Sequence, residues 1–204
     1  SIALNSQIGV GTTAGENYTL RGLGGDDTFN LNPTPTGVAV RVEGDEPGAS
    51  DVINFTSVGT TTINLGASTI EDGAVAPTPN VSYSGIETIN ANANGQILTV
   101  VATADDDTLV VTPFGGNAGT LQNNGAAPVV NYTNVSANTV NVNLSTGEDT
   151  LVVNATAAAE ALVTACAKAR WLSDKPSHES WRPLGSLEGA ELTGAVFVLD
   201  SHLS

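Results

Sequence analysis

Residues 107–112 read Asp-Thr-Leu-Val-Val-Thr, and related segments stand at 149–153 as Asp-Thr-Leu-Val-Val and at 51–55 as Asp-Val-Ile-Asn-Phe. In each segment an acidic residue precedes a short run of β-branched and other apolar side chains. Such runs have the length and composition of β-strands. Because one unit of acid plus strand recurs along the chain, the sequence predicts a repetitive β-structure.

Strands are expected on both sides of these segments, throughout residues 1–154. Clusters of Gly, Pro and Asn divide this region into strand-length runs, and no run has the period of a helix. The expected strands cover residues 27–31, 38–42, 51–55, 61–65, 86–90, 97–101, 108–112, 129–132, 139–144 and 150–153. The region is therefore predicted to be all-β.

The repeats are long and loosely spaced. Asp51 and Asp107 are 56 positions apart, and Tyr83 and Tyr132 are 49 positions apart. Units of this length suit a parallel β-solenoid (β-helix) or tandem small β-sandwich modules. We favour the solenoid, with coils of about 22 residues, because a thin core needs few aromatic side chains and only 4% of the chain is aromatic. Asn and Thr side chains would then stack in ladders on successive coils.

The chain changes character near residue 155. Residues 1–154 contain 15 of the 21 acids and two of the six cations, whereas residues 155–204 contain both Trp, both His and Cys166. The alanine-rich run 155–172 predicts a helix of about four turns, and 194–199 predicts a short strand. We therefore expect a repeat region, 1–154, and a C-terminal α-helix plus short strand, 155–204, that serves as a cap or is an atypical tail.

Charge and hydropathy narrow the partners. The formal net charge of −15 disfavours nucleic acid and anionic lipid. No apolar run approaches the roughly 18 residues of a membrane span. We therefore expect no nucleic-acid partner and no membrane insertion. Clustered carboxylates favour hard cations, above all calcium.

Three acidic turns are the candidate calcium sites, and they lie at residues 22–29, 105–109 and 147–151. Each has a turn, two acids, a Thr and then a core hydrophobe. In the alternative interpretation, the acids cap turns at solvated corners and bind no metal. The candidate metal ligands are Asp26, Asp27, Asp105, Asp106, Asp107, Glu148 and Asp149.

These turns and strands resemble the repetitive secreted surface proteins of bacteria that are abundant in planctomycetes. The resemblance is closest over 98–153, weaker over 17–97 and absent after 155. It implies an extracellular or cell-surface location and a structural or adhesive role.

The turns are also distantly similar to the RTX calcium repeat, which implies calcium bound between coils. The residues that match its glycine, aspartate and hydrophobe are Gly25, Asp27 and Phe29 in the first turn, and Gly147, Asp149 and Leu151 in the last. The aspartates are 24, 56 and 42 positions apart, so we do not expect a regular ladder of ions.

We expect an extracellular structural or adhesive protein without catalytic activity. Parallel β-helices also include polysaccharide lyases and glycosidases, which use paired carboxylates. Here only Asp105 and Asp107 would share one face of a strand. A carbohydrate-binding or carbohydrate-active β-helix, of the phage-fibre or lyase kind, is therefore one alternative, and a subunit that associates end to end into filaments is another. The expected partner is a cell-surface polysaccharide or a second copy of the chain.

Overall fold

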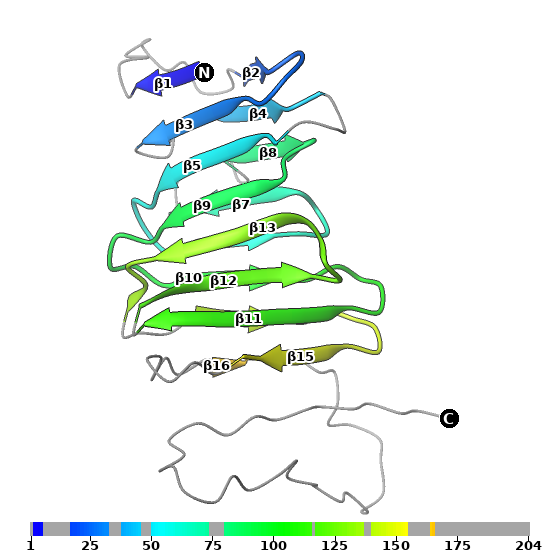
Figure 1. The fold of residues 1–204 in the computed structure, drawn as a ribbon. Coiled ribbons are helices and arrows are strands. Elements are labelled where there is room, and N and C mark those ends of the chain that lie inside the picture. The colour runs from blue at the N-terminus through cyan, green and yellow to red at the C-terminus, as the bar shows by residue number, and fades with distance from the viewer. Residues whose placement is uncertain are drawn as a thin grey trace, which may run out of the picture.

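The computed structural model describes residues 2–5, 17–32, 38–45, 50–73, 80–115, 117–136, 140–154 and 164–165. These residues form β-strands and turns with no α-helix, which confirms the all-β prediction for the described part of the chain. The strands make two eight-stranded sheets, both mostly parallel, and neither sheet closes on itself (Figure 1). None of the described residues belongs to a helix long and apolar enough to cross a membrane.

One sheet, called the first sheet below, contains most of the recurring acid-plus-strand units. In spatial order its strands are β1 (Ile2–Asn5), β3 (Thr28–Asn32), β5 (Val52–Thr56), β9 (Thr88–Asn92), β13 (Ala126–Thr133), β12 (Ala118–Asn123), β11 (Thr108–Gly115) and β15 (Thr150–Val153). Strand β12 runs antiparallel to both neighbours, and the other pairs are parallel. The parallel strands are in register, so that Phe29 lies opposite Ile53 and Ile53 opposite Ile89.

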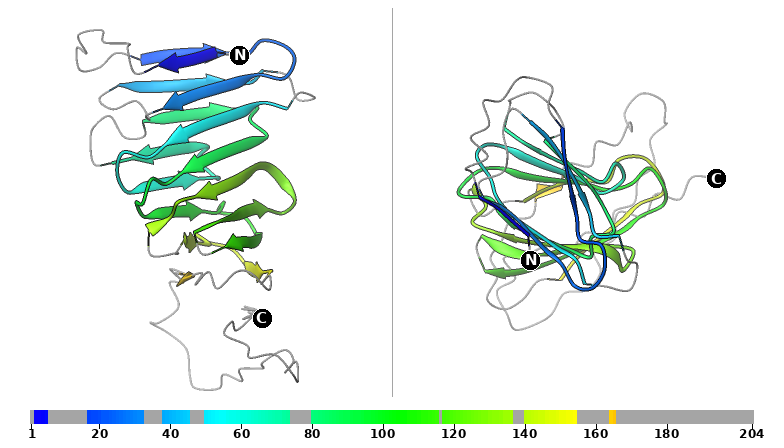
Figure 2. Two further views of the ribbon diagram at one scale, coloured as in Figure 1. Left: turned by 60° about the vertical axis from the view of Figure 1, so that its left-hand side comes forward. Right: turned by 90° about the horizontal axis from the view of Figure 1, so that it is seen from above.

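The second sheet has the same plan. In spatial order its strands are β2 (Asn17–Arg21), β4 (Ala39–Glu43), β8 (Val81–Ser84), β7 (Thr69–Asp72), β6 (Thr61–Asn64), β10 (Leu98–Val101), β14 (Val140–Asn143) and β16 (Thr164–Ala165). Strand β7 is antiparallel to β6 and β8, and the other pairs are parallel. Figure 2 shows the strands of both sheets stacked along one direction.

Two antiparallel meanders interrupt the parallel stacking, one in each sheet. In β6–β7–β8 and again in β11–β12–β13 the chain crosses three neighbouring positions of one sheet before it changes to the other. A tight turn at Asn124 and Gly125, whose φ angles are 49° and 66°, connects β12 to β13. Asn-Gly is the preferred pair for such a turn, because both positions need a positive φ.

The meanders overturn the expected spacing of about 22 residues between stacked strands. Asn30 and Asn54 on paired strands are 24 positions apart, but Asn54 and Asn90 are 36 apart and Asn90 and Asn131 are 41 apart. The longer intervals arise because each contains one meander. The 42 positions between Asp107 and Asp149 have the same cause.

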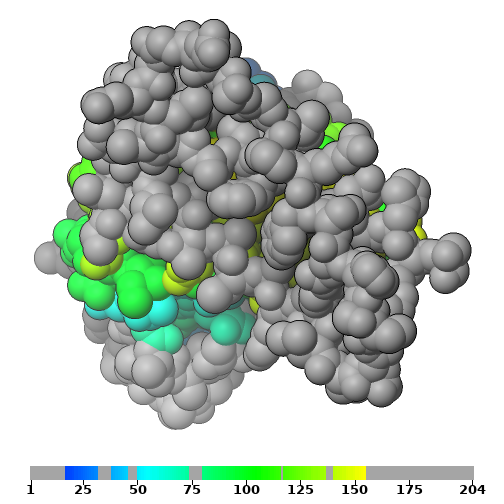
Figure 3. All heavy atoms as spheres, turned by 90° about the horizontal axis from the view of Figure 1, so that it is seen from below, coloured from blue at the N-terminus to red at the C-terminus, as the bar shows by residue number. Residues whose placement is uncertain are grey.

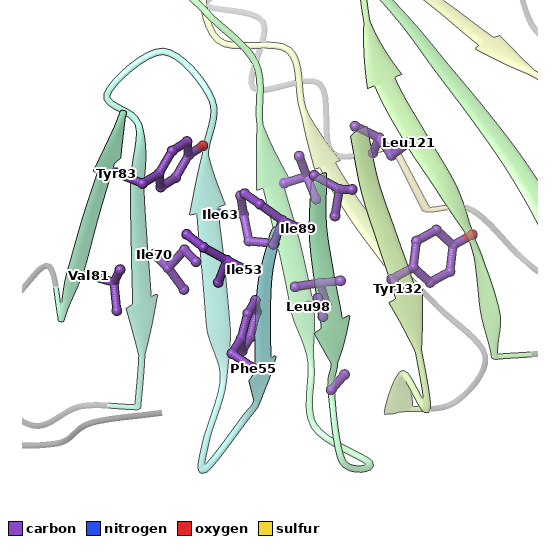
Figure 4. Close-up of a cluster of buried hydrophobic side chains, with 14 of the residues drawn as sticks. Ile53, Phe55, Ile63, Ile70, Val81, Tyr83, Ile89, Leu98, Leu121 and Tyr132 are labelled. Atoms are coloured by element: carbon purple, nitrogen blue, oxygen red, sulfur yellow. The ribbon is translucent and has the colours of Figure 1, made fainter. Parts of the chain in front are cut away.

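The core lies between the two sheets and is narrow. Strand residues alternate between buried and partly exposed, as in β5, where Ile53 and Phe55 point inward. Buried side chains of both sheets form one cluster (Figure 4). The aromatic members with at most 2% exposure are Phe29, Phe55 and Tyr132, which agrees with the expected thin core of aliphatic residues. Burying each such side chain stabilises the fold by about 1.5–3 kcal/mol.

All ten predicted strands overlap observed ones. The predicted strands do not include β1, β2, β7, β8, β12 or β16. For β12, the Asn124-Gly125 pair was the available signal of an antiparallel neighbour. The predicted C-terminal helix lies outside the described residues, apart from Thr164 and Ala165. These two residues pair with β14 as strand β16. Backbone pairing at the sheet edge outweighs the helix propensity of the alanine-rich run there.

Candidate functional site

The acidic residues of the first sheet gather along one of its edges. Asp27, Asp51, Glu87, Asp107 and Asp149 each stand directly before one of its parallel strands, namely β3, β5, β9, β11 and β15. Parallel strands in register begin on the same side of the sheet, at their N-terminal ends. The residues directly before them therefore stack on one another. We call these five residues, with their neighbours Asp26, Asp106 and Glu148, the acidic corner.

Backbone hydrogen bonds link the corner acids of adjacent strands. The Asp27 N–H donates to Asp51 Oδ1 at 2.7 Å, and the Asp51 N–H donates to Glu87 Oε2 at 2.7 Å. In the same way the Asp107 N–H donates to Asp149 Oδ1 at 3.0 Å. The carboxylates of Asp51, Glu87 and Asp149 therefore each accept a hydrogen bond from a backbone N–H group of the adjacent turn. Without the carboxylate, that N–H group would lack a partner at the corner.

The acid that precedes Asp27 or Asp107 also accepts a backbone N–H of the neighbouring turn. Asp26 Oδ1 accepts the Ser50 N–H at 2.9 Å, and Asp106 Oδ1 accepts the Glu148 N–H at 2.9 Å. In each pair of consecutive acids, the first carboxylate thus accepts an N–H of the neighbouring turn, and the second acid donates its own N–H to a carboxylate of that turn. This recurring pattern is a structural reason for the acid pairs that the sequence analysis singled out.

Asp107 is the most heavily hydrogen-bonded acid of the corner. Its side chain belongs to a residue only 2% exposed, and Thr103 donates to it through the backbone N–H at 2.7 Å and through Oγ1 at 2.9 Å. Asn123 Nδ2 and Asn124 Nδ2 add donors at 2.5 and 3.2 Å. The carboxylate oxygens therefore face donors, which a bound cation would have to displace.

Glycine makes room for two of the carboxylates. A Cβ atom added to Gly44 would lie 2.3 Å from Asp51 Oδ2 and 1.8 Å from the Gly85 carbonyl oxygen. A Cβ atom at Gly22 would lie 2.7 Å from Asp27 Oδ2. Asp51 Oδ2 is buried and has no hydrogen-bond partner among the described residues, and it rests against the Gly44 backbone instead.

The structure brings the seven predicted metal ligands into two groups. Asp26 and Asp27 adjoin the turn at Ser50 and Asp51, whereas Asp105, Asp106 and Asp107 adjoin Glu148 and Asp149. Strands β9, β13 and β12 separate the groups. Within the described residues, no three His, Cys, Asp or Glu side chains are placed to share a metal ion. Calcium binding stays a prediction, and the contacts favour the structural interpretation of the acids.

In the group formed by Asp105, Asp106, Asp107, Glu148 and Asp149, the pKa of Asp149 is raised. Burial, and then the charges of Asp107 and Asp106, raise the pKa of Asp149, while the hydrogen bond from the Asp107 N–H opposes them. Asp105 is exposed, and its N–H donates to Thr103 Oγ1 at 3.2 Å. Asp105 and Asp107 therefore differ in their surroundings, since one carboxylate faces water and the other is enclosed.

Another buried acid, Asp72 at the end of β7, was not predicted because its strand was not predicted. Asp72 is fully buried and accepts the N–H groups of Val58 and Gly59 at 2.9 and 3.0 Å, together with Thr61 Oγ1 at 3.0 Å. Its own N–H donates to Asn80 Oδ1 at 2.6 Å. It fastens the turn between β5 and β6 to β7.

The two arginines of the repeat region meet one acid on the second sheet. Arg21 and Arg41 both bond through Nε to Glu43, which is 8% exposed. The hydrogen bond from Arg21, and then the one from Arg41, lower the pKa of Glu43. The sequence offered one signal for this contact, since Arg41 and Glu43 are two apart on a strand and share a face.

The expected ladder of asparagines is present on the outer side of the first sheet. Asn54 Nδ2 donates to Asn30 Oδ1 at 2.8 Å, Asn90 to Asn54 at 2.7 Å, and Asn131 to Asn90 at 2.8 Å. Four strands that are far apart in the sequence are thereby joined by side chains as well as by backbone.

A second contact series lies where the chain leaves the same strands. Asn94 Nδ2 donates to the Ser57 carbonyl oxygen at 3.3 Å, and Asn134 Nδ2 donates to Asn92 Oδ1 at 3.0 Å. Figure 3 shows the molecule from below, and on one side atoms from distant parts of the sequence, coloured cyan, green and yellow, lie next to one another.

No protein-family model, curated protein or solved structure matches the chain.

Proposed function

We propose that the described strands form a parallel β-solenoid with coils of unequal length, and that this solenoid is a rigid stalk within an extracellular structural or adhesive protein. In this interpretation the protein has no catalytic activity. The observation that carries the proposal is the position of the first and last strands among the described residues. Strands β1 and β2 stand at one end of the two sheets, and β15 and β16 stand at the other (Figure 1).

A chain that enters a stack of strands at one end and leaves it at the other keeps the segments joined to those two ends at a fixed distance from each other. Stacked strands advance about 4.8 Å each, so six steps from β3 to β15 span about 29 Å. The asparagine ladder and the acidic corner connect these steps through side chains, which supports a stiff spacer. The extracellular location is supported by the resemblance to secreted surface repeats.

Pulsed electron paramagnetic resonance on the full chain tests the stalk. Spin labels are placed at Thr28→Cys on β3 and Val152→Cys on β15 in a Cys166→Ser background, since both positions lie on the outer side of the first sheet. We expect a narrow distance distribution centred near about 30 Å.

The same doubly labelled protein in strong denaturant is the control and should give a broad distribution. A broad distribution under native conditions would contradict a rigid spacer. A narrow one centred below about 20 Å would contradict the stacking of the strands.

A further inference from the structure

The outer face of the first sheet is uncharged, although the chain has 21 acids and six cations. Where the side chains are described, its strands point only Thr, Asn, Gln, Val, Ala and Phe away from the core. These outward residues are Thr28, Asn30, Val52, Asn54, Thr56, Thr88, Asn90, Asn92, Thr108, Val110, Thr112, Phe114, Ala118, Thr120, Gln122, Ala127, Val129, Asn131, Thr133, Thr150 and Val152. The acids of this sheet lie at its edge, in the acidic corner.

The outer face of the second sheet is the natural comparison, and it is charged. Arg21, Arg41, Glu43 and Glu71 lie on it. These charges lie on β2, β4 and β7, whereas the outward residues of β6, β10 and β14 are also Thr, Asn and Val. The first sheet differs because none of its strands with described side chains points a charge outward. This difference separates charge from one face of a strongly anionic protein.

The hydrogen-bonding capacity of the uncharged face is regular. Outward side chains recur about 4.8 Å apart from strand to strand and about 6.8 Å apart along a strand. Within the ladder, Asn54 and Asn90 each use one amide N–H and one oxygen lone pair on their neighbours. An amide has two of each, so every rung keeps one donor and one acceptor for an external partner.

Charge complementarity selects the partner. An anionic partner would be repelled by the acidic corner that borders the face, and a cationic partner would be drawn to the corner and away from the face. A neutral partner whose groups both donate and accept hydrogen bonds matches the remaining donors and acceptors of the asparagine ladder. Sugar hydroxyls have this property.

We propose that the outer face of the first sheet is a docking surface for a neutral polysaccharide. The proposal deepens the adhesive side of the proposed function, and it needs the stacked strands but not the stalk role. Phe114, at the edge of this face on β11, is 60% exposed and offers an apolar ring to the C–H face of a sugar.

Sedimentation of the full chain with insoluble neutral polysaccharides tests the proposal. The probes are microcrystalline cellulose, chitin and an insoluble β-1,3-glucan. We expect saturable binding to at least one probe, which persists at high salt because no ion pair contributes. Thr120→Glu, in the middle of the face on β12, should weaken that binding at least about tenfold by placing an unpaired charge in the contact.

Thr99→Glu is the matched control, because Thr99 occupies a central outward position on β10 of the second sheet. It should leave binding unchanged. A second pair guards against misfolding, since Gln122→Glu and Asn141→Asp add a charge without a change of shape. Gln122→Glu should weaken binding and Asn141→Asp should not, and thermal unfolding of each variant reports its folding.

Three results would overturn the proposal: no probe binds the unaltered protein, the first-sheet variants bind as well as the unaltered protein, or the second-sheet variants lose binding equally. The distance measurement described above is independent of all three. If the distance distribution is narrow and no polysaccharide binds, the docking-surface proposal is therefore wrong and the stalk proposal still holds.

Discussion

Single asparagine side chains connect neighbouring strands of the first sheet. Asn90 sits between Asn54 and Asn131 and makes one hydrogen bond to each. These bonds are partly exposed, but they connect strands that are 36 and 41 residues apart in the sequence. A side-chain ladder of this kind stabilises long-range pairing, for which the chain has already lost considerable conformational entropy.

Replacing Asn90 by alanine should lower the free energy of unfolding by about 2 kcal/mol, because two hydrogen bonds worth about 1 kcal/mol each are lost. Urea denaturation followed by circular dichroism measures the change. Thr88→Ala, on the same face of the same strand, is the control and should cost less than about 0.5 kcal/mol. Equal losses in the two variants would show that the ladder adds nothing to stability.

Tyr132 introduces a pH dependence at the residue scale. Its ring is 2% exposed, its hydroxyl has no hydrogen-bond partner among the described residues, and burial raises its pKa to about 12. An unfolded tyrosine ionises near pH 10, so stability should be constant below about pH 10 and fall as the pH rises to about 12. Burial also raises the pKa of Tyr83, which adds to the same loss.

Tyr132→Phe should keep its full stability at pH 8 and lose less than the unaltered protein at about pH 11, since the titrating hydroxyl is gone. Urea denaturation at both pH values measures this. An identical alkaline loss in the two proteins would assign the pH dependence to other groups.

At the scale of elements, turns determine how the strands stack. The acidic corner couples consecutive turns through N–H to carboxylate hydrogen bonds, and glycine allows the carboxylates to approach the backbone. The meanders depend on other turns, such as Asn124 and Gly125 between β12 and β13. Strand sequences of one kind thus enter parallel or antiparallel pairs according to the turn that precedes them.

Gly44→Ala should be among the most destabilising alanine substitutions, at about 3 kcal/mol, because the added methyl group would overlap Asp51 and the Gly85 carbonyl. Gly115→Ala is the control, since a Cβ atom there has no heavy atom within 4 Å. Thermal unfolding compares the two. Similar melting temperatures would mean that the corner backbone relaxes without cost.

The whole molecule carries a formal net charge of −15. Many of the acids accept hydrogen bonds within turns. Charged residues lie on the outer face of the second sheet, and the described outward residues of the first sheet are neutral. A metal that bound only the folded state would raise the melting temperature by an amount that grows with the logarithm of its affinity.

We expect the melting temperature to differ by less than about 2 °C between about 5 mM calcium and excess chelator, because the carboxylates already have donors; a site filled at 100 times its Kd would add about 2.7 kcal/mol. Far-UV circular dichroism measures both melts. A rise of several degrees with calcium would instead support the ligands proposed at the acidic turns. Excess magnesium in place of calcium controls for simple charge screening.

Part of this architecture follows from the sequence by itself. Alternation of apolar and polar residues with turn residues between them determined the all-β class and the ten predicted strands, because side-chain direction in a strand has a period of two. The spacing of Asn54 and Asn90 within their strands likewise determined the ladder, once the strands stack.

The tertiary structure alone decided which strands pair and in which direction. The residues of β7 and β12 do not by themselves determine that these strands run antiparallel to both neighbours, and the Asn124-Gly125 turn signals this direction only for β12 and β13. It also decided that Asp107 and Asp149, 42 positions apart, share a hydrogen bond, while Asp105 faces water. The physical reason is that pairing and burial depend on contacts between segments distant in sequence, whose register is set by the whole stack and not by either segment alone.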